Sequence, residues 1–118
     1  MATTTKPFDN YTVQIRGGTE GRIALLLCYQ GASYVGRIAF YEDGTELVPD
    51  YLFHPGTQEE VRIIMPMKRF GAVMSIVRNE KPLALYIDVD RGPGAATIGH
   101  GHLITSEREP VGEEEGTP

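Results

Sequence analysis

The sequence is poor in cysteine and contains no long apolar run. Cys28 is the single cysteine, so no intramolecular disulfide can form, which is typical of proteins in a reducing compartment. No window approaches the roughly 18 uncharged apolar residues of a membrane span, and the first residues lack the apolar stretch of a signal peptide. We therefore expect a cytoplasmic protein without a membrane segment.

Motifs of nucleophilic catalysis and of phosphate binding are also absent. Ser33, Ser75 and Ser106 lie in no G-x-S-x-G sequence, and there is no G-x-x-x-x-G-K loop. Cys28 lies in a strongly apolar stretch, where a thiol is usually an inert packing group. The sequence thus nominates no catalytic residue and no cofactor, and it favours a noncatalytic protein without excluding an enzyme.

Basic charge is scarce, and acidic charge is concentrated at one end of the chain. The net charge is −5 over 118 residues, and the segment 107–118 alone carries five glutamates and one arginine. Residues 1–106 are therefore almost neutral, which argues against non-specific nucleic-acid binding because that requires a basic surface. We expect one β-rich domain over residues 1–106, followed by an acidic tail, 107–118, that is mobile.

Alternation of apolar and polar residues predicts strands in the first part of the chain. The segment 11–15 has this period of two, the segment 23–27 repeats it after a glycine-rich turn, and a further strand is expected at 34–41. One antiparallel register matches their apolar positions: Ile15 with Ile23, Val13 with Leu25, Tyr11 with Leu27, Ile38 with Leu25, and Phe40 with Ile23.

The dipeptide Asp43-Gly44 predicts a tight hairpin turn, because both central residues of such a turn need positive φ. The turn would place Phe40 opposite Leu47 and start a fourth strand, which Pro49 confines to an edge or ends early. We therefore predict a four-stranded meander over residues 10–48.

Helical periodicity occurs in the segment 67–79. Pro66 suits the start of this helix, and Asn79 suits its exit. Further strands are expected near 51–53, 60–65, 83–89 and 95–105. The apolar stripe of the helix, at i, i+3, i+4 and i+7, consists of Phe70, Val73, Met74 and Val77.

These elements predict an α+β fold that is predominantly antiparallel β. We expect a single-domain sandwich or partly closed barrel of six to eight strands, with the helix at about residues 67–79 covering an open end or edge.

His100 and His102 lie two apart on a predicted strand and would point to one face. Two imidazoles need at least one further ligand to hold a metal ion. Matching apolar faces pairs Ile87 with Ile98, Leu85 with His100, and Leu83 with His102. This register turns Asp88 to the other face, together with Gly99 and Gly101. We therefore predict no metal site and histidines that border the core. An alternative is a ligand pocket, for which the candidate residues are His100, His102, His54 and Tyr86.

Arginines form the second candidate site. In the predicted registers Arg16 lies opposite Arg22, and Arg37 lies on the same face near Leu26. Like charges directly opposite each other are unfavourable, so Arg16, Arg22 and Arg37 are candidates for binding an anion. The same face faintly resembles a platform for single-stranded nucleic acid. A solvated outer face is the simpler interpretation, because Glu20 and Glu46 lie close by.

The run RNEKPLALY (78–86) and the ending EPVGE (109–113) resemble a group of small uncharacterised bacterial proteins. In that group a helix runs into an R-N-E-K-P exit, a strand follows, and the chain ends in E-P-V-G-E. The resemblance covers roughly residues 66–115. It implies a bacterial source and a helix-to-strand boundary at Pro82, and it brings no activity, substrate or catalytic residue.

Three functions are compatible with these observations. The favoured one is a noncatalytic binding or interaction module that self-associates as a homodimer, because long sheet edges must be covered, bulged or paired. The first alternative is a small-molecule-binding barrel, or a metal-assisted enzyme, around His100 and His102. The second alternative is single-stranded nucleic-acid binding on the Arg16/Arg22/Arg37 face.

Overall fold

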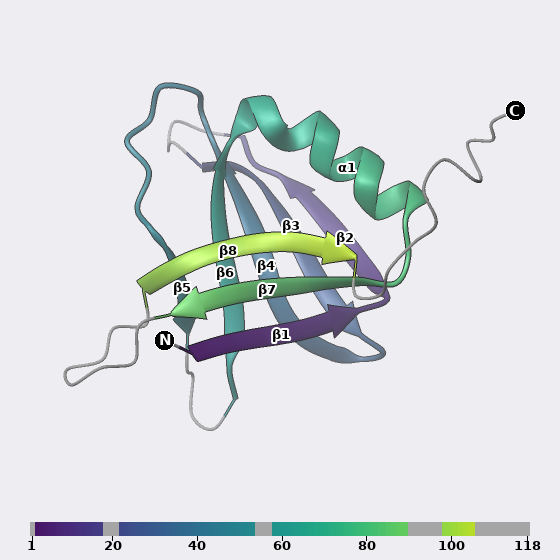
Figure 1. The fold of residues 1–118 in the computed structure, drawn as a ribbon. Helices are drawn as coiled ribbons and strands as arrows, with labels where there is room; N and C mark the ends of the chain where they lie inside the picture. The colour runs from purple at the N-terminus through teal and green to yellow at the C-terminus, as the bar shows by residue number, and fades with distance from the viewer. Residues whose placement is uncertain (1, 18–21, 54–57, 90–97, 106–118) are drawn as a thin grey trace, which may run out of the picture.

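The computed structural model describes residues 2–17, 22–53, 58–89 and 98–105 of the chain. His54 and the segment 107–118 lie outside these ranges. The described elements are β1 (Ala2–Phe8), β2 (Asn10–Ile15), β3 (Arg22–Gln30), β4 (Ser33–Tyr41), β5 (Asp50–Phe53), β6 (Glu60–Pro66), the 3-10 helix η1 (Met67–Arg69), α1 (Phe70–Asn79), β7 (Leu83–Val89) and β8 (Ile98–Thr105) (Figure 1).

All eight described strands belong to one sheet in the order β1-β7-β8-β5-β6-β4-β3-β2. Every neighbouring pair is antiparallel except β4 and β6, which are parallel. With one α-helix beside this sheet, the chain is a single compact α+β domain with mostly antiparallel strands, as the sequence predicts.

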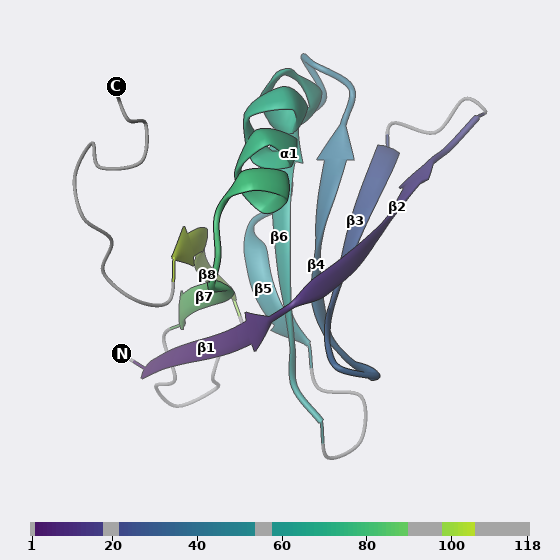
Figure 2. The same cartoon turned by 90° about the vertical axis from the view of Figure 1, so that its right-hand side faces the viewer.

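The sheet coils back on itself, so that its two edge strands meet end to end. β1 and β2 are separated by Asp9 alone, and together they form one long bent strand (Figure 2). Asp9 Oδ1 accepts hydrogen bonds from Gly31 N–H (3.0 Å) and Asn10 Nδ2 (2.6 Å), which ties this bend to the β3–β4 turn. The result is a partly closed barrel.

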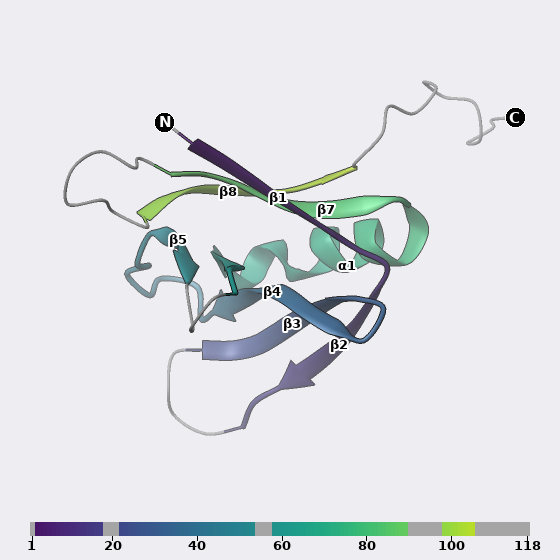
Figure 3. The ribbon, with the colours of Figure 1, turned by 90° about the horizontal axis from the view of Figure 1, so that it is seen from below.

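The strands β1, β7 and β8 cross in front of β3, β4 and β6 at a steep angle, and α1 lies along the open side between these two layers (Figures 1 and 3). The predicted helical stripe is confirmed: Val73, Met74 and Val77 are buried. Phe70 is partly buried, and its ring meets that of Phe40 edge to face at 5.1 Å. Aromatic pairs favour this geometry.

The core lies between the layers and beneath α1. Its fully buried larger side chains come from β3 to β7 and comprise Leu26, Cys28, Ile38, Phe40, Leu52, Val61, Ile63, Leu85, Ile87 and Val89.

The predicted register is wrong by one residue for β2 with β3, and for β3 with β4 between Ala24 and Cys28. Val13 pairs with Leu26, which in turn pairs with Ile38. Because side chains alternate, a one-residue slip exchanges the two faces. The face of β3 that lies in the core therefore carries Ala24, Leu26 and Cys28.

The predicted meander is correct for its first three strands and wrong for the fourth. A turn forms at Asp43-Gly44, with Thr45 N–H donating to Glu42 O, but Gly44 (φ +91°) is its only central residue with positive φ, so the predicted hairpin turn with two such residues does not form. However, residues 45–49 are not a strand, and β4 instead pairs in parallel with β6.

Gly36 explains how β6 takes this place beside β4. A Cβ on Gly36 would collide with the carbonyl oxygen of Val61 and lie 2.8 Å from Cδ1 of Leu85. The glycine therefore allows the close approach of the two strands, which no pattern of apolar residues encodes.

Within the described residues, no helix has the length and apolar character needed to cross a membrane.

Candidate functional site

The two histidines do not border the core. In the observed register of β7 and β8, Tyr86 lies opposite His102 and Asp88 lies opposite His100. Both histidine side chains are exposed. This pairing differs from the predicted register by three residues, and an odd shift exchanges the faces of a strand. The prediction that Asp88 points away from the histidines is therefore also wrong.

Gly99 and Gly101 lie on the inner face of β8 instead, together with Leu103. A Cβ on Gly101 would lie 2.6 Å from Cγ1 of Ile63, and one on Gly99 would collide with the backbone of Asp88. The predicted position of both glycines on the face opposite the core is wrong, because the absence of side chains is what lets β8 approach the barrel interior.

Tyr86 joins the outer face of the same strand pair. Its hydroxyl donates to Asp88 Oδ1 at 2.8 Å, which raises the pKa of Tyr86, and its ring lies 5.6 Å from that of His102. Within the ranges that the structure describes, no three His, Cys, Asp or Glu side chains are grouped as metal ligands would be.

A cavity of about 390 Å³ lies beside Asp50, the first residue of β5. β5 separates β6 from β8 only up to Asp50, and beyond it the two strands continue with no strand between them. Asp50 spans the start of this gap: its Oδ1 accepts from Ile64 N–H and its Oδ2 from Gly101 N–H, both at 2.8 Å.

The walls of this cavity, which we call the β6–β8 cavity, come from β6, β8 and α1. It is mainly apolar, with Asp50, Arg69 and His102 as its polar members. Of the predicted pocket candidates, His102 therefore lines a cavity, whereas His100 and Tyr86 do not line it.

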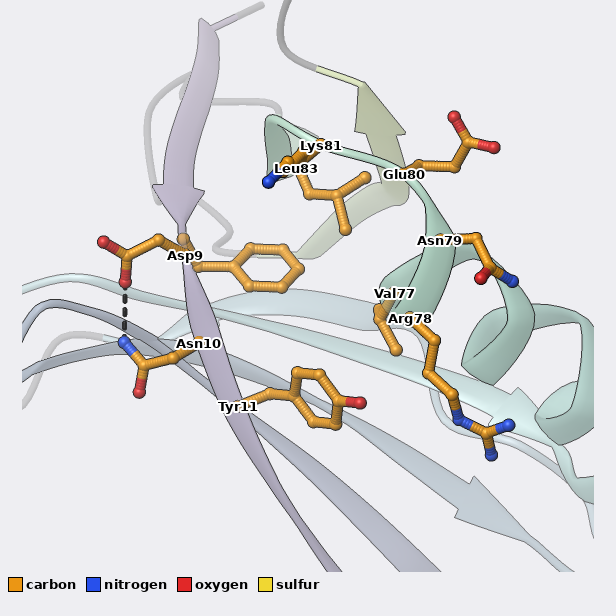
Figure 4. Close-up of a pocket in the computed structure, with 10 residues that line it drawn as sticks. Asp9, Asn10, Tyr11, Val77, Arg78, Asn79, Glu80, Lys81 and Leu83 are labelled. Carbon is orange, nitrogen blue, oxygen red and sulfur yellow. Dashed lines mark hydrogen bonds between the residues drawn. The ribbon is translucent and has the colours of Figure 1, made fainter. Parts of the chain in front are cut away.

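A second cavity, of about 200 Å³, lies between the β1–β2 bend and the end of α1. Figure 4 shows Tyr11, Val77 and Leu83 approaching one another from β2, α1 and β7, while the ends of Asn79 and Glu80 point outward. The volume of this cavity is smaller than the about 300–1,000 Å³ that ligand pockets usually occupy.

The predicted arginine group is not assembled. Arg16 lies opposite Ile23 rather than Arg22, since its backbone N–H donates to Ile23 O. Arg37 is level with Leu27 and Thr12. Arg37 is therefore separated from Arg16 by four residues along the strand direction, which is about 13 Å. Across the sheet, the two residues are two strand spacings of about 4.8 Å apart. Arg22 pairs with Tyr41 through its backbone, and its side chain is outside the described ones.

The structure places a different arginine beside Arg37. Arg62 of β6 is the direct partner of Arg37 in the parallel ladder, so both side chains lie on the outer face of the barrel. Arg62 Nε donates to Glu60 Oε2 at 2.7 Å, and Nη1 donates to the Tyr51 hydroxyl at 3.0 Å. Its guanidinium carbon lies 3.9 Å from the ring centre of Phe53, close enough for a cation–π contact.

Glu60 is the other half of this arrangement. It is 7% exposed, and its Oε2 also accepts from the Tyr34 hydroxyl at 2.9 Å. Burial and the bond to Glu60 raise the pKa of Tyr34. Burial alone would lower the pKa of Arg62, but its bonds to Glu60 and Tyr51 raise it. We call Tyr34, Tyr51, Phe53, Glu60 and Arg62 the Glu60–Arg62 cluster.

Sequence reasoning missed this cluster. Its signal is the spacing of two in Glu60-x-Arg62 and Tyr51-x-Phe53, which places each pair on one face of its strand.

The edge strand β2 exposes apolar side chains. Val13 is 36% exposed and Ile15 is 63% exposed, although both lie on the face of β2 that continues into the core through Tyr11. The strand thus extends past the layer that would cover it.

No protein-family model, no curated protein and no solved structure matches this chain.

Proposed function

We propose that this protein is a noncatalytic binding or interaction module that self-associates as a homodimer through β2. The observation that carries this proposal is the exposure of Val13 and Ile15 on an edge strand. An apolar edge strand is a template for pairing with another chain unless it is blocked.

The hydrogen-bonding groups of β2 support pairing with a second copy. In an antiparallel ladder the residues that bond to a given neighbour alternate. Because Arg16 N–H donates to β3, the backbone groups of Tyr11, Val13 and Ile15 point to the free edge. Centring an antiparallel pair on Val13 places Tyr11 opposite Ile15 of the second copy, so all the outward groups of this strand find partners.

The side chains are compatible with the same register. Residues 11–15 carry no charge, and Arg16 would lie opposite Asn10 of the second copy. No like charges face each other, which would otherwise disfavour the pairing. The paired strands would also shield Val13 and Ile15 from water.

Light scattering during size-exclusion chromatography tests this proposal. We expect a dimer for the unmodified protein and a monomer for Ile15→Lys, because the substitution places two lysines beside the shared edge. Val48→Lys is the matched control, since Val48 is 58% exposed and lies outside β2, and it should remain dimeric. Circular dichroism checks that both variants fold. A monomeric unmodified protein, or a dimeric Ile15→Lys protein, contradicts the proposal.

A bacterial, cytoplasmic setting belongs to this proposal. The buried, unpaired thiol of Cys28 supports a reducing compartment, and the RNEKP and EPVGE segments support the source. Fractionation of cells that produce the protein tests the location.

The β6–β8 cavity supports a second candidate function, the binding of a small apolar molecule. Its volume of about 390 Å³ is within the range of ligand pockets, and its walls are mainly apolar. Titration with benzene, followed by backbone NMR shifts, should perturb residues of β6, β8 and α1.

The control for this titration uses two positions on α1. Ala72→Trp should abolish the shifts by filling the cavity, whereas Ser75→Trp should not, because Ser75 is exposed on α1 and does not line the cavity. Equal shifts in both variants would contradict a site in the cavity.

A further inference from the structure

Arg37 and Arg62 form a pair of like charges on neighbouring strands. They are direct partners in the β4–β6 ladder, and both line a small hollow of about 50 Å³. Two adjacent guanidinium groups repel each other unless negative charge lies near both. The described residues provide one carboxylate here, that of Glu60, and it bonds to Arg62 and Tyr34.

Arg37 is therefore left without a carboxylate among the described residues, although it is partly buried. Arg62, by contrast, is held in place by Glu60, Tyr51 and Phe53. A guanidinium has five N–H donors, and two of those of Arg62 are used in these bonds. The remaining N–H donors of Arg62 are thus fixed in place, and Arg37 adds a charged guanidinium without a carboxylate partner among the described residues. Together they are suited to binding one anion between them.

The remaining lining provides further donors. Tyr51 accepts a hydrogen bond from Arg62, so its own hydroxyl proton is available to donate. Tyr41 lines the same hollow and brings a second hydroxyl, while Val48 and Ile64 supply apolar sides. Since about 10–15 Å³ is the least that holds one water, the hollow has room for a group of a few heavy atoms.

We propose that the Arg37–Arg62 hollow binds a phosphate group, carried by inorganic phosphate or by a small phosphomonoester. The charge, the donors and the size of the hollow suit a compact tetrahedral dianion. This site is independent of the β2 dimer, because it lies on β4 and β6, and either proposal can fail without the other.

The test is a titration of the ¹⁵N-labelled protein with inorganic phosphate at constant ionic strength, followed by NMR of the arginine Nε–H groups. We expect saturable shifts at Arg37 and Arg62. Arg37→Gln should weaken binding on the order of tenfold or more, since it removes a charged hydrogen-bonding partner. Arg78→Gln is the matched control, because Arg78 is an exposed arginine on α1 outside this hollow, and it should bind as the unmodified protein does.

Two further arms complete the experiment. Arg37→Lys keeps the charge but loses the planar fork, so it should bind between the unmodified protein and Arg37→Gln. A parallel titration with phenyl phosphate identifies the source of the phosphate group: tighter binding than inorganic phosphate supports an ester, and weaker binding supports the free ion.

The proposal is overturned if phosphate gives no saturable shift at millimolar concentration, or if Arg37→Gln binds as well as the control. It is also overturned if a short oligothymidylate binds far more tightly than phosphate and displaces it, because the ligand would then be a single-stranded nucleic acid.

Discussion

The carboxylate of Asp50 accepts a hydrogen bond from the backbone N–H of Gly101, 51 residues further along the chain, at 2.8 Å. The other carboxylate oxygen accepts from Ile64 N–H. One side chain thus satisfies the edges of β6 and β8 at the point where β5 no longer separates them.

Replacing Asp50 by alanine should therefore destabilise the fold. Two partly buried N–H groups lose their acceptor, at about 1–3 kcal/mol for each group left unsatisfied. We expect Asp50→Ala to lower the free energy of unfolding by about 2–4 kcal/mol in urea denaturation. The control is Asp43→Ala, whose carboxylate accepts from Lys68 N–H at an exposed position, and it should cost less than about 1 kcal/mol. Equal effects would show that Asp50 does not hold the two strands.

The inner face of β8 should tolerate no side chain where it carries glycine. Gly101→Ala places a methyl group 2.6 Å from Cγ1 of Ile63, and overpacking of this kind typically costs about 1–3 kcal/mol. His100→Ala, one residue away on the exposed face, should change stability by less than about 0.5 kcal/mol. Thermal and urea unfolding of both variants measure the difference. A large loss for His100→Ala with none for Gly101→Ala would indicate that the two faces are exchanged.

Among the residues at the N-terminal end of the helical segment, Phe70 should lose the most stability when it is replaced by alanine. Its ring is partly buried and packs on Phe40 at 5.1 Å. Phenylalanine-to-alanine changes in full burial cost about 3–5 kcal/mol, so Phe70→Ala should cost about 2–4 kcal/mol. Lys68→Ala and Arg69→Ala, at exposed positions, should cost far less. Small and equal effects of the three changes in urea denaturation would mean that α1 is not held by its apolar stripe.

Cys28 should be unreactive in the folded protein. Its side chain is fully buried, and burial raises the pKa of the thiol from 9.0 to about 12. At pH 8 it stays protonated, and the thiolate is the reactive form. A disulfide reagent should label it only as fast as the protein unfolds, and completely in urea. Rapid labelling without denaturant would contradict this burial.

The same shift should make stability fall at high pH. Above pH 9 the unfolded chain loses the Cys28 proton while the folded chain keeps it, so the loss grows until the pH reaches about 12. At about pH 10.5 the contribution is on the order of 2 kcal/mol. The difference in unfolding free energy between the unmodified protein and Cys28→Ala should therefore shrink from pH 8 to pH 10.5. A constant difference would show that the thiol titrates equally in both states.

Local patterns in the sequence were sufficient for most of the elements, but they did not predict β1, and the strand predicted after Gly44 does not form. The stripe of α1 and the period of two in β7 predict their residue ranges closely, because a helix or strand with one apolar face repeats at its own period. The turn at Asp43-Gly44 also forms, since its backbone needs a residue that adopts positive φ without cost.

The register of each strand was not determined by these patterns. Residues 23–28 are apolar on both faces, so a shift of one residue leaves the pairing of apolar positions nearly as good. In β8 two of the inward positions, Gly99 and Gly101, carry no apolar side chain to align, and Leu103 is the inward apolar residue that remains. The face of His100 and His102 was mispredicted for this reason.

The candidate sites were decided by tertiary structure alone. Arg37 was already a candidate anion ligand from its sequence, but its neighbour is Arg62 because β6 inserts in parallel beside β4, a pairing that the backbone approach at Gly36 permits. The β6–β8 cavity exists because Asp50 is the first residue of β5, and no strand separates β6 from β8 beyond it. The sequence by itself determined where α1 and most of the strands lie, since those depend on neighbours a few residues apart. Which strands pair, and which side chains meet, depends on contacts between residues far apart in the chain, and the period of an isolated segment carries no information about its partner.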